Sequence, residues 1–274
     1  NKANLLLGSN LPSNKPLHPN DDINKSQSSN DTIPTAMHIA TVLLIKRELL
    51  PAILKIKKTL KKKVKEFNKV IKIGRTHTQD ATPIKLSNEF LAFHDQIDYA
   101  EKKILQSLNK LFQLAQGGTA VGSGVNAPKD FSKKFIKNLQ KFTKLPFKSA
   151  SNKYEALASH DVFIEVMSSM EILTSSLFKM ANDIRVLSSG PRSGIAELIL
   201  PANEPGSSIM PGKINPTQCE ALSMVCAHVI GLRSSVSFAC TKGHFQLNVY
   251  MTVSMRRPVH AWRAGWPQRL MGHV

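Results

Sequence analysis

Residues 152–188 read NKYEALASHDVFIEVMSSMEILTSSLFKMANDIRVLS, and this stretch decides the fold class. Its large apolar residues recur three or four positions apart, so they share one face of a long helix. Alternation of apolar and polar residues, the pattern of a half-buried strand, is almost missing. The stretch therefore predicts one long core helix. Its apolar face is formed by Phe163, Val166, Met167, Met170, Leu173, Leu177 and Met180.

Further helical stretches surround this one. Pro51 interrupts the earliest of them and is predicted to kink or break it, because proline cannot donate a helical hydrogen bond. Gly- and Pro-rich connectors separate the stretches, and short strands are expected near Ile71 and Leu198. The sequence therefore predicts a mainly all-α fold, a bundle of long helices with a few short strands and loops. The further helical stretches lie at about 35–70, 87–115 and 217–236.

Residue usage predicts three regions along the chain. Residues 1–34 are rich in Asn, Ser, Asp and Pro and are expected to be mostly loop, a remnant of an N-terminal domain. Residues 35–255 are expected to form the central helical-bundle domain. Residues 256–274 form an atypical tail, because both tryptophans fall there and arginine replaces lysine. A frameshift or a divergent natural end would explain that tail.

The net charge of +18 first suggests a nucleic-acid partner. The lysines between Lys57 and Lys65, however, alternate with Leu60, Val64 and Phe67, which predicts a solvated helix face. Three cysteines without a CxxC pair favour neither a disulfide framework nor a zinc site. No stretch approaches the roughly 20 apolar residues of a membrane span. We therefore expect no nucleic acid, no membrane and no metal.

The most specific motif is the segment 206–216, GSSIMPGKINP, which precedes a helix starting near Thr217. Its glycines and prolines suit a mobile loop that closes over a ligand. Its hydroxyls, lysine and amide can all donate hydrogen bonds to a carboxylate. The alternative interpretation is an ordinary surface loop.

Two further polar segments suit an anionic ligand. Residues 74–80, GRTHTQD, contain His77, a residue type that carries protons near neutral pH, although a lone histidine is more often structural. The residues Ala81–Pro83 that follow are expected to open a helix. Residues 26–31, SQSSND, offer hydroxyl and amide donors, and they also predict an N-cap for a helix beginning near Pro34.

These three motifs, and above all 204–220, resemble the class II fumarases of the aspartase/fumarase superfamily. The resemblance covers about residues 16–255. It implies that Ser207 is the catalytic base, that His77 handles the water or hydroxyl group, and that Glu220 tunes this histidine. It implies substrate-binding roles for Ser28, Ser29, Asn30, Thr76, Ser208, Lys213, Ile214 and Asn215.

The resemblance also implies a secondary carboxylate site and three further family segments. The secondary site would contain Lys15, His18, Pro19, Asn20 and Asp21. Fumarases have arginine where this chain has Lys15, and lysine lacks the two-pronged geometry of a guanidinium. The further family loops are 117–124, 152–156 and the pair His160-Asp161.

The function that the resemblance implies is the reversible trans addition of water to fumarate, giving L-malate, without a metal or organic cofactor. The family forms homotetramers whose active sites draw residues from three chains, in the cytoplasm or, in eukaryotes, the mitochondrial matrix. Apolar patches are therefore expected to be exposed on the helices near 160–185 and 217–236 of a lone chain. The family also carries a substrate-binding segment upstream of residue 1 and a C-terminal domain, so this chain alone is expected to be poorly active.

Three alternatives remain. Aspartate ammonia-lyases look similar through 204–220, but they tend to carry Gln where His77 stands and Ser-Thr-Asn where this chain has Ser28-Ser29-Asn30. An inactive remnant of a fumarase is the second alternative. A basic, helical nucleic-acid-binding protein is the third.

Overall fold

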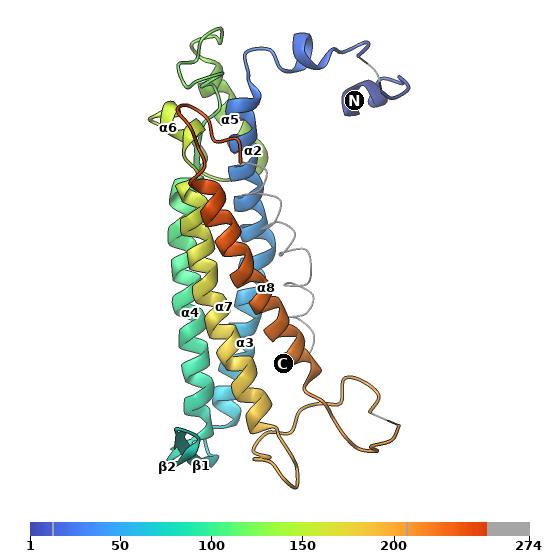
Figure 1. The fold of residues 1–274 in the computed structure, drawn as a ribbon, viewed down its shortest axis with the longest axis vertical. Helices are drawn as coiled ribbons and strands as arrows, with labels where there is room; N and C mark the ends of the chain where they lie inside the picture. Colours follow the sequence, from blue (N-terminus) through green and yellow to red (C-terminus); the bar gives the residue numbers. More distant parts are fainter. Residues whose placement is uncertain (13, 207, 251–274) are drawn as a thin grey trace. The chain divides into compact units, whose positions relative to one another are not determined.

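A computed structural model describes residues 1–12, 14–206 and 208–250 (Figure 1). These residues form two compact units, which are described separately. The first unit comprises residues 1–40, 110–160 and 240–250, and the second comprises 41–109 and 161–239. The predicted tail at 256–274 lies outside the described residues, and the predicted domain boundaries remain a hypothesis.

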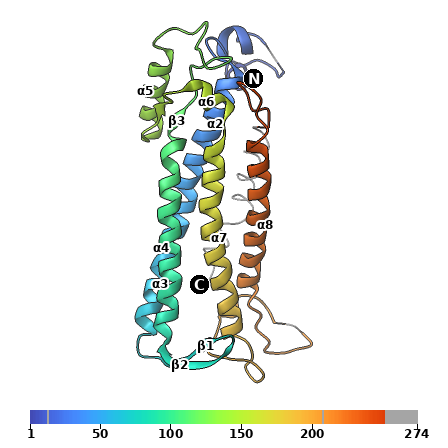
Figure 2. The same ribbon diagram turned by 60° about the vertical axis from the view of Figure 1, so that its left-hand side comes forward.

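The second unit is a bundle of long helices that run side by side in both views (Figures 1 and 2). The predicted all-α architecture is thus confirmed. The core of the bundle is largely made by the apolar stripe of α7, in which Phe163, Leu173 and Leu177 are buried. The helices of the bundle are η2 Ile45–Leu49, α3 Leu50–Glu66, α4 Leu86–Leu111, α7 Asp161–Leu187 and α8 Thr217–Cys240.

The helical stretch predicted at 35–70 is interrupted just before Pro51. Helix α2, Ser29–Leu44, gives way to the π-helical turn η2, and the Leu50 N–H donates to the Ile45 carbonyl five residues back. Pro51 then occupies the first turn of α3, directly after the wider turn of η2. The wider turn therefore takes the place of the predicted kink.

The prediction of a single helix over 152–188 is wrong at one point. The structure has α6, Lys153–Ala158, and then α7, which begins at Asp161. Ser159 between them is extended, with φ −111° and ψ 137°. An acidic residue such as Asp161 favours a helix N-terminus through the helix dipole, but the apolar spacing runs on across the break and hides it.

Helix α8 overturns the expectation that no stretch approaches a membrane span. By length and composition alone this 24-residue helix could cross a membrane, with a mean hydropathy of 1.3 over its most apolar window. One such helix is weak evidence, because core helices of soluble proteins pass the same test. Only 22% of that window is buried within this chain.

The two helices predicted to expose apolar patches, α7 and α8, differ in this respect. On α7 the prediction is wrong for most of the helix, because most of its large apolar side chains are buried within the chain. Ile164 and Ile172 are half-buried, and Phe178 and Val186 are exposed. On α8 it is confirmed, since Met224 is 69% and Phe238 59% exposed, and Ile230 is also exposed. Part of the apolar surface of α8 is therefore not covered by other residues of this chain.

The first unit contains more structure than the predicted loop at 1–34. Helix α1, Lys2–Leu6, the π-helical turn η1, Pro19–Ile23, and the start of α2 lie there. Helix α5, Phe131–Thr143, was not predicted; it is short, rich in lysine and has no buried residue. Two short parallel strands, β3 Gln113–Leu114 and β4 Lys148–Ser149, also lie in this unit.

The strand expected near Ile71 belongs to an antiparallel hairpin of β1, Ile71–Thr76, and β2, Gln79–Lys85. Residues Ala81–Pro83 lie in β2, so the predicted helix entry there is wrong, and α4 begins at Leu86 instead. Near Leu198 the described chain is irregular rather than a strand.

The lysine-rich face of α3 is solvated as predicted, except at Lys57. Its side chain is 15% exposed and its Nζ lies 2.5 Å from an Asp98 oxygen and 2.6 Å from a Glu101 oxygen, both on α4. Hydrogen bonds from Lys102 and Lys57 hold the pKa of Asp98 well below its usual range. Lys57 therefore joins two helices, which lysine spacing alone could not show.

His38 in the first unit predicts a loss of stability in mild acid. The imidazole is buried and its Nδ1 donates to the Leu111 carbonyl oxygen at 3.1 Å. Burial, the largest cause, lowers the pKa of His38 from 6.5 to about 4. Between these values the unfolded chain binds a proton that the folded chain does not, so folding stability falls as the pH decreases from 6.5 to 4. The expected loss is about 3 kcal/mol.

The measurement is urea-induced unfolding of the protein and of its His38→Gln variant at several pH values between 6.5 and 4. Carboxylates titrate in both proteins, so the difference between the two pH slopes isolates the histidine. Parallel slopes would show that His38 contributes nothing to the acid sensitivity.

Candidate functional site

The residues that the sequence singled out occur in both units, and each group is described within its own unit. In the second unit, apart from Glu220 in α8, they lie at the tip of the β1–β2 hairpin and in the loop 204–216. Both are at the same end of the helical bundle (Figures 1 and 2).

The β1–β2 turn places His77 at the exposed tip of the hairpin. Thr76 pairs with Gln79, so His77 and Thr78 form a two-residue turn. Both have positive φ angles, 53° and 62°, as type I′ hairpin turns require. Asn and Gly adopt this conformation most easily, whereas a β-branched threonine there is strained by about 1–3 kcal/mol. Backbone strain retained at an exposed histidine is typical of a functional position.

The base of the hairpin is held by a cluster of charges. Lys72 on β1 contacts Glu89 of α4 and Glu197 of the segment after α7, at 2.8 and 2.6 Å. Arg75, two residues before His77, lies 2.6 Å from the other Glu197 oxygen. Sequence reasoning missed Glu197, because nothing near it in sequence indicates a partner 122 residues away.

The loop 204–216 is exposed and irregular, which suits a segment that closes over a ligand. Lys213 donates its backbone N–H to the Met210 carbonyl at 3.2 Å, and Gly212 takes a positive φ of 80°. The Thr217 hydroxyl, where α8 begins, donates to Glu204 at 2.5 Å and closes the loop at its ends. Ser207 lies outside the described residues, and the predicted binding residues Ser208, Lys213, Ile214 and Asn215 are all exposed.

Glu220, predicted to tune His77, lies in the first turn of α8. Its carboxylate is 3.5 Å from the Arg185 guanidinium of α7. No contact between Glu220 and His77 is formed among the residues described in this chain. A role for Glu220 on a histidine remains a prediction.

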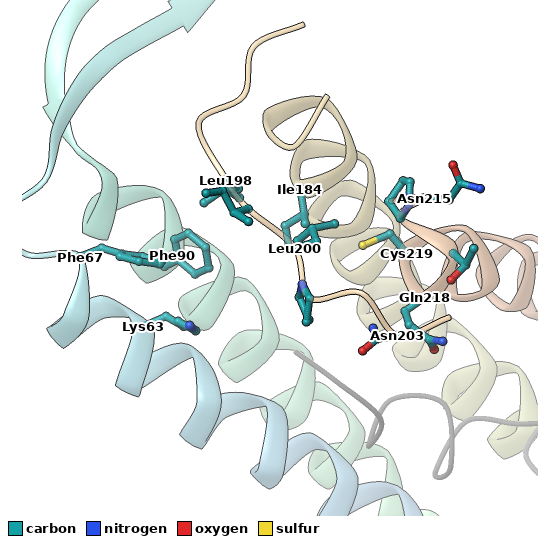
Figure 3. A pocket seen from close by; sticks show the side chains of 14 residues that line it. Lys63, Phe67, Phe90, Ile184, Leu198, Leu200, Asn203, Asn215, Gln218 and Cys219 are labelled. Atoms are coloured by element: carbon teal, nitrogen blue, oxygen red, sulfur yellow. The ribbon is translucent and has the colours of Figure 1, made fainter. Parts of the chain in front are cut away.

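A pocket of about 130 Å³ lies beside the loop (Figure 3). Phe67, Phe90 and Leu198 are among its apolar lining residues, and Asn215 is the predicted binding residue that reaches it. Its lysine, Lys63, is paired with Glu66 at 3.3 Å. This lining is too apolar for a dicarboxylate, which requires several charge-assisted donors. Burial also raises the pKa of the Cys219 thiol at its edge, which makes it a poor nucleophile.

In the first unit, Ser28 is both a predicted binding residue and the N-cap of α2. Its hydroxyl accepts the Asn30 N–H at 3.2 Å, and the Asp31 carboxylate accepts the Ser28 N–H at 3.0 Å. The predicted N-cap is thus confirmed, with the helix beginning at Ser29 rather than near Pro34. The Asn30 amide donates to the Ala120 carbonyl at 2.9 Å, and Ser29 is exposed.

Asp31 is the residue of this group that sequence reasoning did not single out. It is fully buried, and its second oxygen accepts the N–H groups of Gly117 and Thr119, each at 2.9 Å. One carboxylate therefore joins the Ser28–Asn30 segment to the 117–124 loop. The capping pattern of Ser28 and Asp31 was visible in the sequence, but the contact with residues 86 and 88 positions away was not.

The family loops at 117–124 and 152–156 are packed against each other. Gly122 has φ +108°, and a Cβ there would lie 2.7 Å from the Tyr154 backbone, so only glycine fits. Asn152 caps α6 by accepting the Glu155 N–H at 3.1 Å. His160 is fully buried, and its carbonyl accepts from the Cys240 thiol.

The predicted secondary carboxylate site lies around η1. His18 is the N-cap of this turn, and its Nδ1 accepts the Asp21 N–H at 3.2 Å. The His18 N–H donates to Asp22 at 2.7 Å. This segment is open to a ligand, because its exposed residues include Lys15, Pro19, Asn20 and Asp21. The carboxylates of Asp21 and Asp22, however, lie next to the histidine.

Among residues 1–12, 14–206 and 208–250, no group of three or more His, Cys, Asp or Glu side chains could hold a metal ion. The residues predicted to bind or transform substrate carry mainly hydroxyl, imidazole, ammonium and amide groups. Such groups bind carboxylates and transfer protons.

The sequence is similar to curated proteins named fumarate hydratase. The chain is 53% identical over 263 residues to class II fumarate hydratase 2 of Bradyrhizobium diazoefficiens, covering 96% of this chain and 56% of that protein. It is 52% identical over 263 residues to the mitochondrial fumarate hydratase of Rattus norvegicus, covering 96% of this chain and 52% of that protein. The chain spans about half the length of the curated relatives it matches.

Solved structures give the same result. The class II fumarase of Schistosoma mansoni superposes with a TM-score of 0.92 at 38% identity, over 97% of this chain and 58% of that one. A fumarate lyase:delta crystallin of Brucella melitensis bound to cobalt also gives 0.92, at 36% identity, over 98% and 58%. The profile of the lyase family matches residues 1–231. The chain therefore belongs to the lyase family, and within it resembles class II fumarate hydratases over nearly its whole length.

Proposed function

We propose that the protein of which this chain is part adds water reversibly across fumarate to give L-malate. The observation that carries the proposal is the pair of segments at one end of the second unit. An exposed, strained His77 turn lies at the same end as a loop with hydroxyls, Lys213 and Asn215. The identity of more than half to fumarate hydratases supports the same reaction.

The proposed chemistry assigns each group one task. Toward L-malate, His77 takes a proton from water, whose oxygen bonds to one alkene carbon of fumarate. The electron pair of the double bond passes into the neighbouring carboxylate, and Lys213 and Asn215 stabilise the resulting aci-carboxylate. Ser207 gives a proton to the other carbon. In the reverse direction Ser207 removes that proton, as an alkoxide that the site must stabilise.

The remaining assignments complete the substrate site. Ser28, Ser29 and Asn30 are proposed to bind a substrate carboxylate. Thr76, Ser208 and Ile214 are proposed as further substrate-binding residues. Glu220 is proposed to act on the histidine of a neighbouring chain, because its partner within this chain is Arg185. The segment around His18 is proposed as the secondary carboxylate site.

The active unit is proposed to be a homotetramer in which chains share sites. The exposed apolar side chains of α8, Met224 and Phe238, support burial of this helix against another chain. Light scattering of the full-length protein tests this, with four chains expected. We place the enzyme in the cytoplasm, or in the mitochondrial matrix if the source is eukaryotic, as several relatives are named mitochondrial.

The experiment that tests the function is an assay of the full-length protein with fumarate, L-malate and L-aspartate in separate reactions. Interconversion of fumarate and L-malate, without release of ammonia from aspartate, is expected. Ammonia release from aspartate without malate turnover would select the aspartate ammonia-lyase alternative. An inactive but folded tetramer would select the remnant.

A further inference from the structure

We propose that Glu197 is a positioning residue for His77. It holds the hairpin that carries His77 against the end of α7, from which the chain continues into the loop 204–216. The proposal rests on the proposed function, because it assumes that His77 handles the water. It adds a residue that lies outside every motif of the sequence.

Each oxygen of Glu197 contacts a different cation of β1. Oε1 lies 2.6 Å from Arg75 Nη2, and Oε2 lies 2.6 Å from Lys72 Nζ. Lys72 is only 6% exposed in its side chain and also contacts Glu89 at 2.8 Å. Two carboxylates and two cations therefore form one partly buried cluster without excess charge.

The backbone of Glu197 is itself fixed. Its N–H donates to the Leu187 carbonyl at 2.8 Å, and the Leu198 N–H donates to the same oxygen at 3.1 Å. Leu187 is the buried last residue of α7, whose apolar stripe lies in the core of the bundle. The Glu197 side chain thus connects the hairpin to a rigid element of the bundle.

The hairpin needs such a connection because it has little apolar packing of its own in this chain. All residues of β2 except Ile84 are exposed, and the strand pairing is irregular between Ile73 and Arg75. An isolated two-stranded hairpin is marginally stable at best in water. The strained His77–Thr78 turn adds a cost that the rest of the hairpin must offset.

Burial alone would raise the pKa of Glu197, but hydrogen bonds from Arg75 and Lys72 outweigh it and lower the pKa. The carboxylate is therefore charged at neutral pH. If an amide replaces this carboxylate, Glu89 is the one carboxylate of the cluster that remains for the two cations, Lys72 and Arg75. An excess positive charge in a partly buried site favours movement of the hairpin into water.

The test is Glu197→Gln in the full-length protein. The expected result is a decrease in kcat of about tenfold or more with KM changed less than about threefold, because the water-handling group is displaced rather than lost. Hydrogen exchange of the amides in residues 71–85 is expected to accelerate about tenfold, while α3 amides remain protected. Glu171→Gln is the matched control, since it removes an ion pair of the same unit, with Arg233 at 2.9 Å, and should change neither quantity.

Arg75→Gln provides a second variant, which gives the same exchange measurement if Glu197→Gln does not fold. If the two residues act together, the double variant should lose no more kcat than the worse single variant. Wild-type kcat with wild-type exchange in Glu197→Gln would overturn the proposal, as would a loss of kcat with an unchanged hairpin. If the wild-type protein does not hydrate fumarate, the proposed function fails, and the exchange measurement alone still decides whether Glu197 holds the hairpin.

Discussion

His77→Asn in the full-length protein is expected to lower kcat for fumarate hydration at least ~100-fold, about 3 kcal/mol in the barrier. The physical reason is that an amide cannot take a proton from water near neutral pH. Asparagine adopts a positive φ more readily than histidine, so the turn at residue 77, now at φ 53°, should lose strain. The thermal midpoint of the variant is therefore expected to stay equal or to rise.

This opposition between activity and stability distinguishes a catalytic histidine from a structural one. Ser207→Ala should give a similar loss of kcat, because the resemblance to fumarases makes Ser207 the base. Ser223→Ala serves as a control, since that hydroxyl donates to the Cys219 carbonyl one helical turn back. Steady-state kinetics with fumarate and thermal unfolding supply the two measurements. Near-wild-type turnover of both site variants would overturn the assignment of the site.

Asp31→Asn is expected to destabilise the protein by about 3 kcal/mol or more and to raise KM for fumarate. The buried carboxylate accepts three backbone N–H groups, from Ser28, Gly117 and Thr119. An amide offers one oxygen, so its NH₂ group must face at least one of these donors. The 117–124 loop and the Ser28–Asn30 segment should then separate, which removes substrate donors from their positions.

Urea-induced unfolding and steady-state kinetics measure the two effects. Asp130→Asn is a suitable control, because it removes an Asp from the same unit whose ion pair with Lys134 is exposed at 2.6 Å. We expect the control to leave the free energy of unfolding nearly unchanged, because solvent screens this exposed ion pair. Equal stability of both variants would show that the buried hydrogen bonds of Asp31 contribute little.

The sequence was sufficient for the parts of the fold that depend on neighbouring residues. The apolar spacing of α7 predicted a long helix, since residues three or four apart share a face whatever the rest of the chain does. The Ser28 cap was also readable, because its hydrogen bonds lie within one helical turn. The motifs around His77 and Lys213 indicated the chemistry by their residue types alone.

Local patterns failed where the chain changes direction without a strong signal. Ser159 separates α6 from α7, yet the apolar spacing continues across it. Ala81–Pro83 resembled a helix entry but pairs with β1, and strand pairing is decided by the partner strand. Helix α5 was missed although its half-buried apolar residues, Phe131, Phe135, Ile136 and Leu139, recur at helical spacing and its lysines are exposed.

By itself, the sequence determined the helical architecture and the residue types of the candidate site. Only the tertiary structure decided which distant groups support those residues. Glu197 meets Arg75 across 122 positions, and Asp31 meets Gly117 across 86. An ion pair or a buried hydrogen bond depends on distance in space, which the order of residues along the chain does not specify until the helices and loops have packed.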